Sequence, residues 1–97
     1  MKSEIIYNQL GGIRFVAMVG AKRIYFTNNQ LRFAIGKNNS GANYVTITLN
    51  GKDLYDINFS KYTMKNYGCV VKSEFTDVYA EQLTKVFESV TGLYTSL

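Results

Sequence analysis

Basic side chains stand next to aromatic ones at several places in the first half of the chain. Arg14-Phe15, the run from Lys22 to Phe26 and Arg32-Phe33 each put a cation directly beside a ring. Proteins that hold single-stranded nucleic acid use this combination, because phosphates need positive charge and unstacked bases need a flat aromatic partner. The pattern therefore favours a nucleic-acid-binding surface.

Tyr25 and Tyr44 are the rings that we expect to be exposed on such a surface. Arg14 and Arg32 each sit between apolar neighbours, on the outward face of an expected strand, and line one basic surface if those strands pair in the right register. The predicted nucleic-acid-binding residues are Arg14, Lys22, Arg23, Tyr25, Arg32, Lys37, Tyr44 and Lys52.

The net charge of +4 is unevenly distributed along the 97 residues. Residues 1–52 hold seven basic side chains against one acidic side chain, a charge of +6, whereas residues 53–97 hold four basic and six acidic side chains, a charge of −2. This asymmetry indicates a surface that faces a polyanion, or head-to-tail association of copies. A solvated face without a partner stays open as the alternative.

The sequence lacks the residues that most enzymes use for catalysis. There is no histidine, the commonest general base and metal ligand. The single cysteine, Cys69, cannot form a zinc cluster or an internal disulfide, and its apolar neighbours predict a small core residue in a reducing compartment. Asp53 and Asp56 fall on opposite sides of an expected strand and make a poor catalytic pair. We therefore expect no enzymatic activity, no metal and no cofactor.

The end of the chain predicts one amphipathic helix that begins at a cap provided by Asp77 and ends at Gly92. Leu93 is then expected to fold back onto Phe87. The apolar positions with helical spacing are Tyr79, Leu83, Val86, Phe87 and Val90.

Upstream of this helix the pattern predicts a short helix and then strands. Ser3 is the expected cap of a helix over residues 4–10, which Gly11-Gly12 ends. The expected strands cover residues 13–19, 23–27, 31–35, 44–49, 52–59 and 67–73, with polar loops at 36–43 and 60–66. Phe15 and Phe33 fall on the apolar sides of their strands and are expected in the core.

Asn50-Gly51 predicts a two-residue type I′ hairpin turn between two of these strands. Val45, Ile47 and Leu49 are then expected to share a face with Tyr55, Ile57 and Phe59.

The expected architecture is one α+β domain over residues 1–97. A curved antiparallel sheet of five or six strands carries a short N-terminal helix and one C-terminal helix packed on the sheet. Open sheet edges and the absence of proline predict a homo-oligomer, most simply a symmetric dimer. No segment approaches the ~20 apolar residues of a membrane span, so we expect no membrane partner.

Residues 10–22, LGGIRFVAMVGAK, resemble a family of small proteins encoded by tailed phages and prophages. The resemblance continues at residues 43–49, 53–56, 78–83 and 91–97, while residues 33–40 are richer in asparagine than is usual in that family. It implies a phage or mobile-element origin, a location in the host cytoplasm and no assigned activity. In architecture alone, a sheet followed by a C-terminal helix is similar to the Whirly-type single-strand binders.

Three functions stay open on the sequence. The first is a phage accessory protein that binds nucleic acid, with single strands as the expected ligand. The second is a protein-interaction module that modulates a host or phage protein through a sheet edge or the tail at residues 94–97. The third is a small structural component of a larger assembly. We favour the first because phosphate binding accounts for the basic half of the chain.

Overall fold

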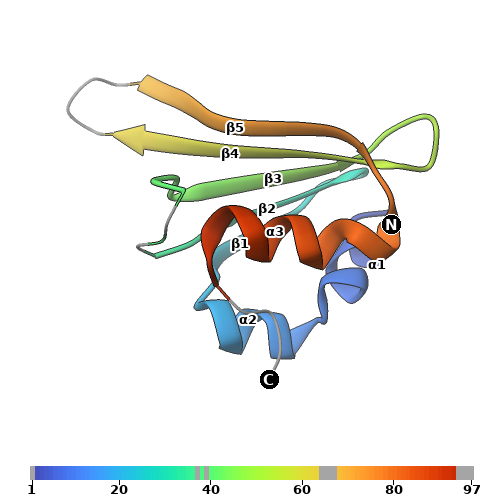
Figure 1. Ribbon diagram of the computed structural model, residues 1–97. Coiled ribbons are helices and arrows are strands. Elements are labelled where there is room, and N and C mark those ends of the chain that lie inside the picture. The colour runs from blue at the N-terminus through green and yellow to red at the C-terminus, as the bar shows by residue number, and fades with distance from the viewer. Residues whose placement is uncertain (1, 37, 39, 64–67, 94–97) are drawn as a thin grey trace.

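The computed structural model describes residues 2–36, 38, 40–63 and 68–93. Its elements are α1 (Lys2–Leu10), α2 (Ile13–Val19), β1 (Lys22–Phe26), β2 (Gln30–Ala34), β3 (Tyr44–Leu49), β4 (Tyr55–Thr63), β5 (Gly68–Val78), the 3-10 turn η1 (Ala80–Gln82) and α3 (Leu83–Thr91). The five strands form one antiparallel sheet in the order β1-β2-β3-β4-β5, and the helices lie on one side of it (Figure 1). The predicted α+β class is confirmed, with two short N-terminal helices instead of one.

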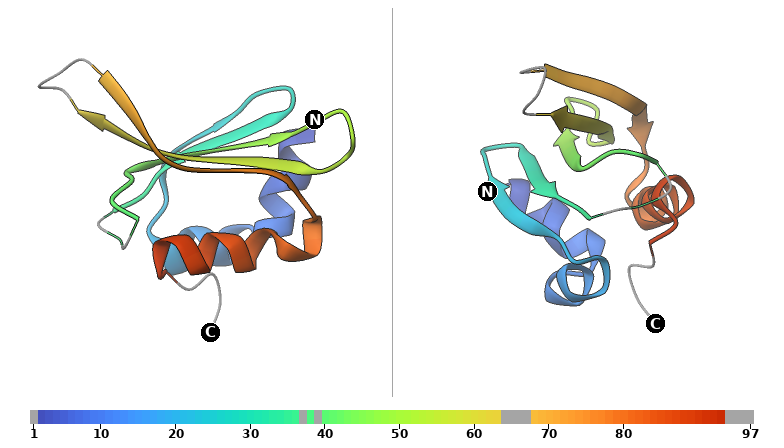
Figure 2. Two further views of the ribbon diagram at one scale, coloured as in Figure 1. Left: turned by 45° about the horizontal axis from the view of Figure 1, so that its top comes forward. Right: turned by 90° about the vertical axis from the view of Figure 1, so that its left-hand side faces the viewer.

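The strands alternate between a face that packs on the helices and a face that does not. In β3, Val45 and Ile47 are buried, whereas the alternating Thr46 and Thr48 are half-buried on the other face. Val45 lies opposite Phe59 and Ile47 lies opposite Ile57, which confirms the predicted pairing of these apolar positions. Figure 2 shows that the sheet twists and that α3 runs beneath it, so the core lies between one sheet face and the helices.

Four phenylalanine rings join the sheet to the helix layer in this core. The ring centroid of Phe87 in α3 lies 5.2 Å from that of Phe15, 6.2 Å from that of Phe33 and 6.1 Å from that of Phe59. Phe15 comes from α2 and the other two come from β2 and β4, so a single side chain of α3 touches a second helix and two strands. All four rings are buried, as predicted for Phe15 and Phe33.

Residues 13–19 form helix α2, so the strand predicted there is wrong. The helix buries Phe15 and Val19, which are four residues apart, and leaves Ile13 79% exposed. A short segment in which six of seven residues are apolar fits both a helical and an extended period. Gly12 and Gly20, with φ angles of 61° and 69°, turn the chain at both ends of the helix.

The β3–β4 connection is longer than the predicted two-residue turn. Leu49 pairs with Tyr55, and Asn50 closes the loop through a backbone bond from its amide to the Leu54 carbonyl at 2.8 Å. Asp53, with φ of 61°, is the left-handed residue of the loop, and Gly51 does not have a positive φ. A turn followed by one left-handed residue is the usual form of a longer hairpin loop, and the side chain of Asn50 accepts bonds from two amides inside it.

Strands β4 and β5 extend beyond their predicted limits. β4 continues to Thr63, through part of the predicted polar loop, and β5 continues to Val78, which pairs with Tyr55. Asp77 is therefore a strand residue and not a helix cap, and Tyr79 lies in an extended segment and is 55% exposed. The C-terminal helix ends as predicted at a left-handed Gly92, after which Leu93 packs against the core.

Some predictions at the chain ends have a different outcome or fall outside the described side chains. Helix α1 begins at Lys2, so Ser3 lies within it rather than at its cap. Val90 is half-buried, and Thr91 takes the buried position at the end of α3. The side chain of Cys69 and the tail at residues 94–97 lie outside what the structure describes.

We predict that Phe87→Ala lowers the free energy of unfolding by about 3–5 kcal/mol, because it opens a cavity among three other rings. Urea unfolding followed by circular dichroism measures this change. Tyr79→Ala is the control, because this ring is 55% exposed just outside the same helix. Equal unfolding midpoints for the two variants would contradict the central role of Phe87.

We predict that a valine substitution destabilises one position of the β3–β4 loop and leaves another nearly unchanged. Asp53→Val costs about 1–2 kcal/mol, because a β-branched residue is disfavoured at positive φ. Gly51→Val stays within about 0.5 kcal/mol of the wild type, since no atom lies within 4 Å of its added Cβ. Thermal unfolding of the two variants measures the difference, and a larger loss for Gly51→Val would support a type I′ turn instead.

Candidate functional site

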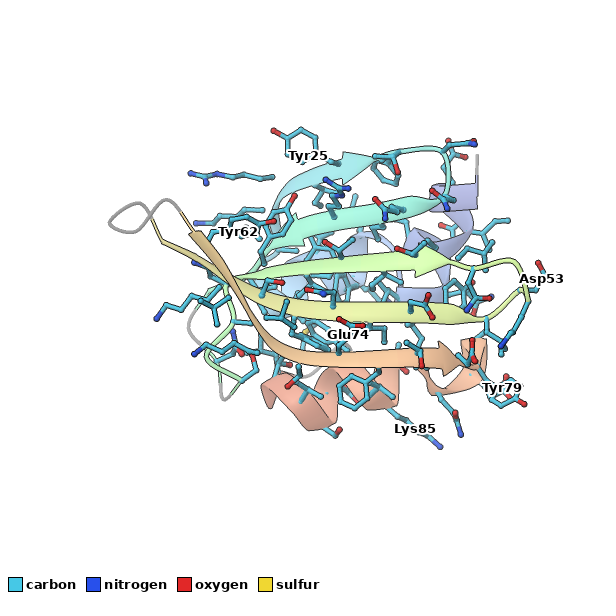
Figure 3. The ribbon with its side chains drawn as sticks, turned by 90° about the horizontal axis from the view of Figure 1, so that it is seen from above. Tyr25, Asp53, Tyr62, Glu74, Tyr79 and Lys85 are labelled. Carbon is cyan, nitrogen blue, oxygen red and sulfur yellow. The ribbon has the colours of Figure 1, made fainter. Side chains whose placement is uncertain are left out.

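The face of the sheet that the helices leave uncovered is the candidate site. Figure 3 looks down on this face, with Tyr25 and Tyr62 toward one end of the sheet and Glu74 over the β4–β5 pair. A shallow hollow of about 380 Å³ runs across it from β2 to β5. Its lining is mostly polar and includes Arg32, Asn58, Tyr62 and Glu74.

A bulge in β1 turns two predicted binding residues toward this face. Lys22 pairs with Ala34 and Tyr25 pairs with Arg32, so one extra residue is accommodated between the two pairs. Directly opposed residues share a face, which puts both Lys22 and Tyr25 on the side of Arg32. Arg23 sits inside the bulge with φ of 53°, a strained conformation for a residue that is not glycine.

A chain of side chains holds the guanidinium of Arg32 in place. The Nε and Nη2 atoms of Arg32 donate to Oε1 of Gln30 at 3.1 Å and 2.7 Å. Gln30 in turn donates from Nε2 to Oγ1 of Thr48 at 3.0 Å. The remaining N–H donors of Arg32 can bind an anion, and an Arg side chain that is already oriented loses less entropy when it does so.

Two tyrosines stack edge to face beside Arg32. The ring centroids of Tyr44 and Tyr62 are 5.1 Å apart, and their planes are nearly perpendicular. Burial raises the pKa of Tyr44, the charge of Arg32 lowers it in part, and Tyr25 adds a smaller increase. A tyrosine hydroxyl is already neutral at neutral pH, and the raised pKa extends this uncharged state to more alkaline solution.

The hollow is acidic at the end formed by β4 and β5, away from Arg32 in β2. Asn58 pairs with Glu74 across β4 and β5, and its Nδ2 donates to Oε2 of Glu74 at 3.3 Å. Ser60 donates from its hydroxyl to Oδ1 of Asn58. Asp56 lines the same end, so the open face changes from cationic at β1–β2 to anionic at β4–β5.

The structure brings together five of the predicted binding residues. Lys22, Tyr25, Arg32 and Tyr44 share the open face, and Arg23 lies beside them in the β1 bulge. Sequence reasoning missed Tyr62 and Glu74 because the expected strands stopped at Phe59 and Ser73. It missed Asn58, which lies inside an expected strand, because its role depends on its pairing with Glu74. The signal available in the sequence was that residues 60–63 can continue the alternating pattern of the strand that contains Phe59.

Two other predicted residues lie elsewhere. Arg14 is exposed on α2, in the helix layer, because the segment expected to be a strand is a helix. Lys52 lies in the β3–β4 loop, where its Nζ forms an ion pair with Asp77 at 3.2 Å. Lys37 falls outside the described residues.

The described residues supply neither a metal cluster nor a membrane helix. They contain no group of three or more acidic, cysteine or histidine side chains placed to hold a metal ion. No helix within those residues combines the length and the apolar character needed to cross a membrane. Comparison of the chain with protein families, curated proteins and solved structures gave no match.

We predict that Tyr55 makes the protein less stable in alkali. Burial raises the pKa of Tyr55 above its ordinary value of about 10, so its contribution to stability is present below that pH and is lost as pH rises through the folded pKa. The melting temperature should fall more steeply above about pH 10 in the wild type than in Tyr55→Phe. Tyr25→Phe, at a ring 60% exposed, is the control and should keep the wild-type profile.

Proposed function

We propose that this protein binds single-stranded nucleic acid across the open face of its sheet. The observation that carries the proposal is the gathering of Lys22, Tyr25, Arg32 and Tyr44 on one uncovered face, next to a hollow. Phosphates would contact the cations at the β1–β2 side, and splayed bases would lie against the tyrosine rings and in the hollow. An exposed ring offers little to a duplex, whose bases are already stacked, so single strands are the expected ligand.

The number of available cations limits the strength of this binding. Lys22, Arg23 and Arg32 are exposed at the β1–β2 side, whereas Asp56 and Glu74 oppose phosphates at the other end. Neutralising about three phosphates on a single strand gives a slope of roughly −2 for log affinity against log salt concentration. The proposed protein is therefore a salt-sensitive binder in which the rings contribute much of the affinity.

The proposed biological setting follows the sequence resemblance. A small, non-enzymatic accessory protein of a phage or mobile element would meet single strands during replication or recombination in the host cytoplasm. A symmetric dimer would double the number of open faces and raise the affinity through two linked contacts.

We predict that Arg32→Gln weakens binding to a fluorescently labelled oligothymidylate by about tenfold or more, because a hydrogen bond to a charged group contributes about 1.5–3 kcal/mol. Arg14→Gln is the matched control: the same change on the helix layer should leave the affinity unaltered. Tyr25→Ala should cost roughly 1–3 kcal/mol. Fluorescence anisotropy measures all three, with thermal melting to verify the fold.

The result that contradicts the proposal is equal weakening by Arg14→Gln and Arg32→Gln, or no binding of the wild type at low salt. Equal weakening would mean that overall charge, and not the open face, attracts the nucleic acid.

One observation favours the alternative, a protein-interaction module. The edge strand β5 and its partner β4 expose apolar side chains, with Tyr62 at 53%, Val70 at 57% and Val71 at 51% exposure. Exposed apolar groups on an edge strand often mark contacts with another chain. Under this alternative the protein does not bind the oligothymidylate, and Val70→Lys weakens a protein contact instead.

A further inference from the structure

The acidic end of the hollow has no role in phosphate binding and needs a different ligand group. Glu74 and Asp56 line this end, while Arg32 lines the opposite end. The two ends are separated by three strand spacings, roughly 14 Å between the backbones of β2 and β5. A ligand that fills the hollow must therefore present an anion at one end and hydrogen-bond donors at the other, as a nucleotide does when its base lies away from its phosphate.

Glu74 is held in position by its neighbours and has acceptor capacity left. Asn58 donates to Oε2 of Glu74 and accepts from the Ser60 hydroxyl, so both ends of the Asn58 amide are engaged. Oε1 of Glu74 has no hydrogen-bond partner among the described residues. An ionised carboxylate only accepts hydrogen bonds, so this end of the hollow requires a group that donates them.

Guanine is the base whose edge matches this requirement. Its Watson–Crick edge carries two adjacent donors, N1–H and the 2-amino group, which can meet the two oxygens of one carboxylate. Adenine and cytosine each set an amino group beside a ring-nitrogen acceptor, and thymine sets its single N–H between two carbonyl oxygens. Those acceptors would face the carboxylate and repel it, because the carboxylate has no proton to share.

We propose that Glu74, positioned by Asn58, gives the open face a preference for guanine over the other bases of a single strand. This inference rests on the proposed binding of single-stranded nucleic acid and adds a specificity-determining residue to it. Arg32 fixes the phosphate, and the carboxylate selects the base that is delivered to the β4–β5 end. The hollow, at about 380 Å³, lies in the size range of roughly 300–1,000 Å³ found for small-molecule sites and suits one nucleotide at a time.

The test compares labelled oligothymidylate of about 15 nucleotides with the same strand carrying scattered guanines, at one fixed salt concentration. We expect the guanine strand to bind the wild-type protein about tenfold more tightly. Replacing each guanine by hypoxanthine, which lacks the 2-amino group, should remove most of that ratio. Glu74→Gln should bring the ratio close to one while binding of oligothymidylate persists.

Glu81→Gln is the matched control, because it removes the same charge from an exposed residue of η1 in the helix layer. It should keep the guanine preference of the wild type. Equal affinity of the wild type for the two strands, or a preference unchanged by Glu74→Gln, overturns this inference and leaves the proposed function standing. Failure to bind either strand at low salt overturns both.

Discussion

The contact of Phe87 with three other phenylalanine rings decides which face of the sheet is covered. That contact ties α3 to the strands and to α2, so these two helices lie on the same side of the sheet. A chain of 97 residues with helices this short covers one face of a five-stranded sheet and no more. The second face must therefore meet water, and its residues are polar for that reason before any function is considered.

A polar face does not have to be ordered, yet this one is. Gln30 orients Arg32 from one side, and Asn58 orients Glu74 from the other. Each network fixes a charged group on a rigid strand instead of leaving it mobile in solvent, and groups fixed in this way bind ligands with a smaller loss of entropy. Such contacts between strands also stabilise a sheet. Here they fix charged groups on a face that gathers Lys22, Tyr25 and Tyr44, which makes the open face a better candidate for function than the helix layer.

The edge strands carry irregularities that affect both the site and the assembly. The bulge at Arg23 in β1 brings Lys22 onto the open face, and it also interrupts the regular hydrogen-bonding edge. β5 has register shifts opposite β4 at two places. Bulged edges pair poorly with a second strand, so the predicted dimer, which stays a prediction, is more easily reconciled with packing of side chains than with a continuous sheet across two copies.

The sequence by itself determined the pattern of burial within each long periodic element. The alternation from Tyr44 to Leu49 predicted a strand with Val45 and Ile47 inward, and the helical spacing of Leu83 and Phe87 predicted the C-terminal helix. Such patterns are local, since a side chain's neighbours along the chain already specify which period it follows. The α+β class followed from these elements, whereas the gathering of Lys22, Tyr25 and Arg32 on one face depended on the bulge in β1.

Only the tertiary structure decided the features that depend on distant partners. Residues 13–19 fit two periods, and the packing of Phe15 against Phe33 and Phe87 selected the helix that took Arg14 away from the site. Asp77 became a strand residue because Asp56 and Asn50, more than twenty residues earlier, bind it there. The pairing of Asn58 with Glu74 depends on strand register and bulges. Register is set by contacts between strands, and no spacing within one strand records it.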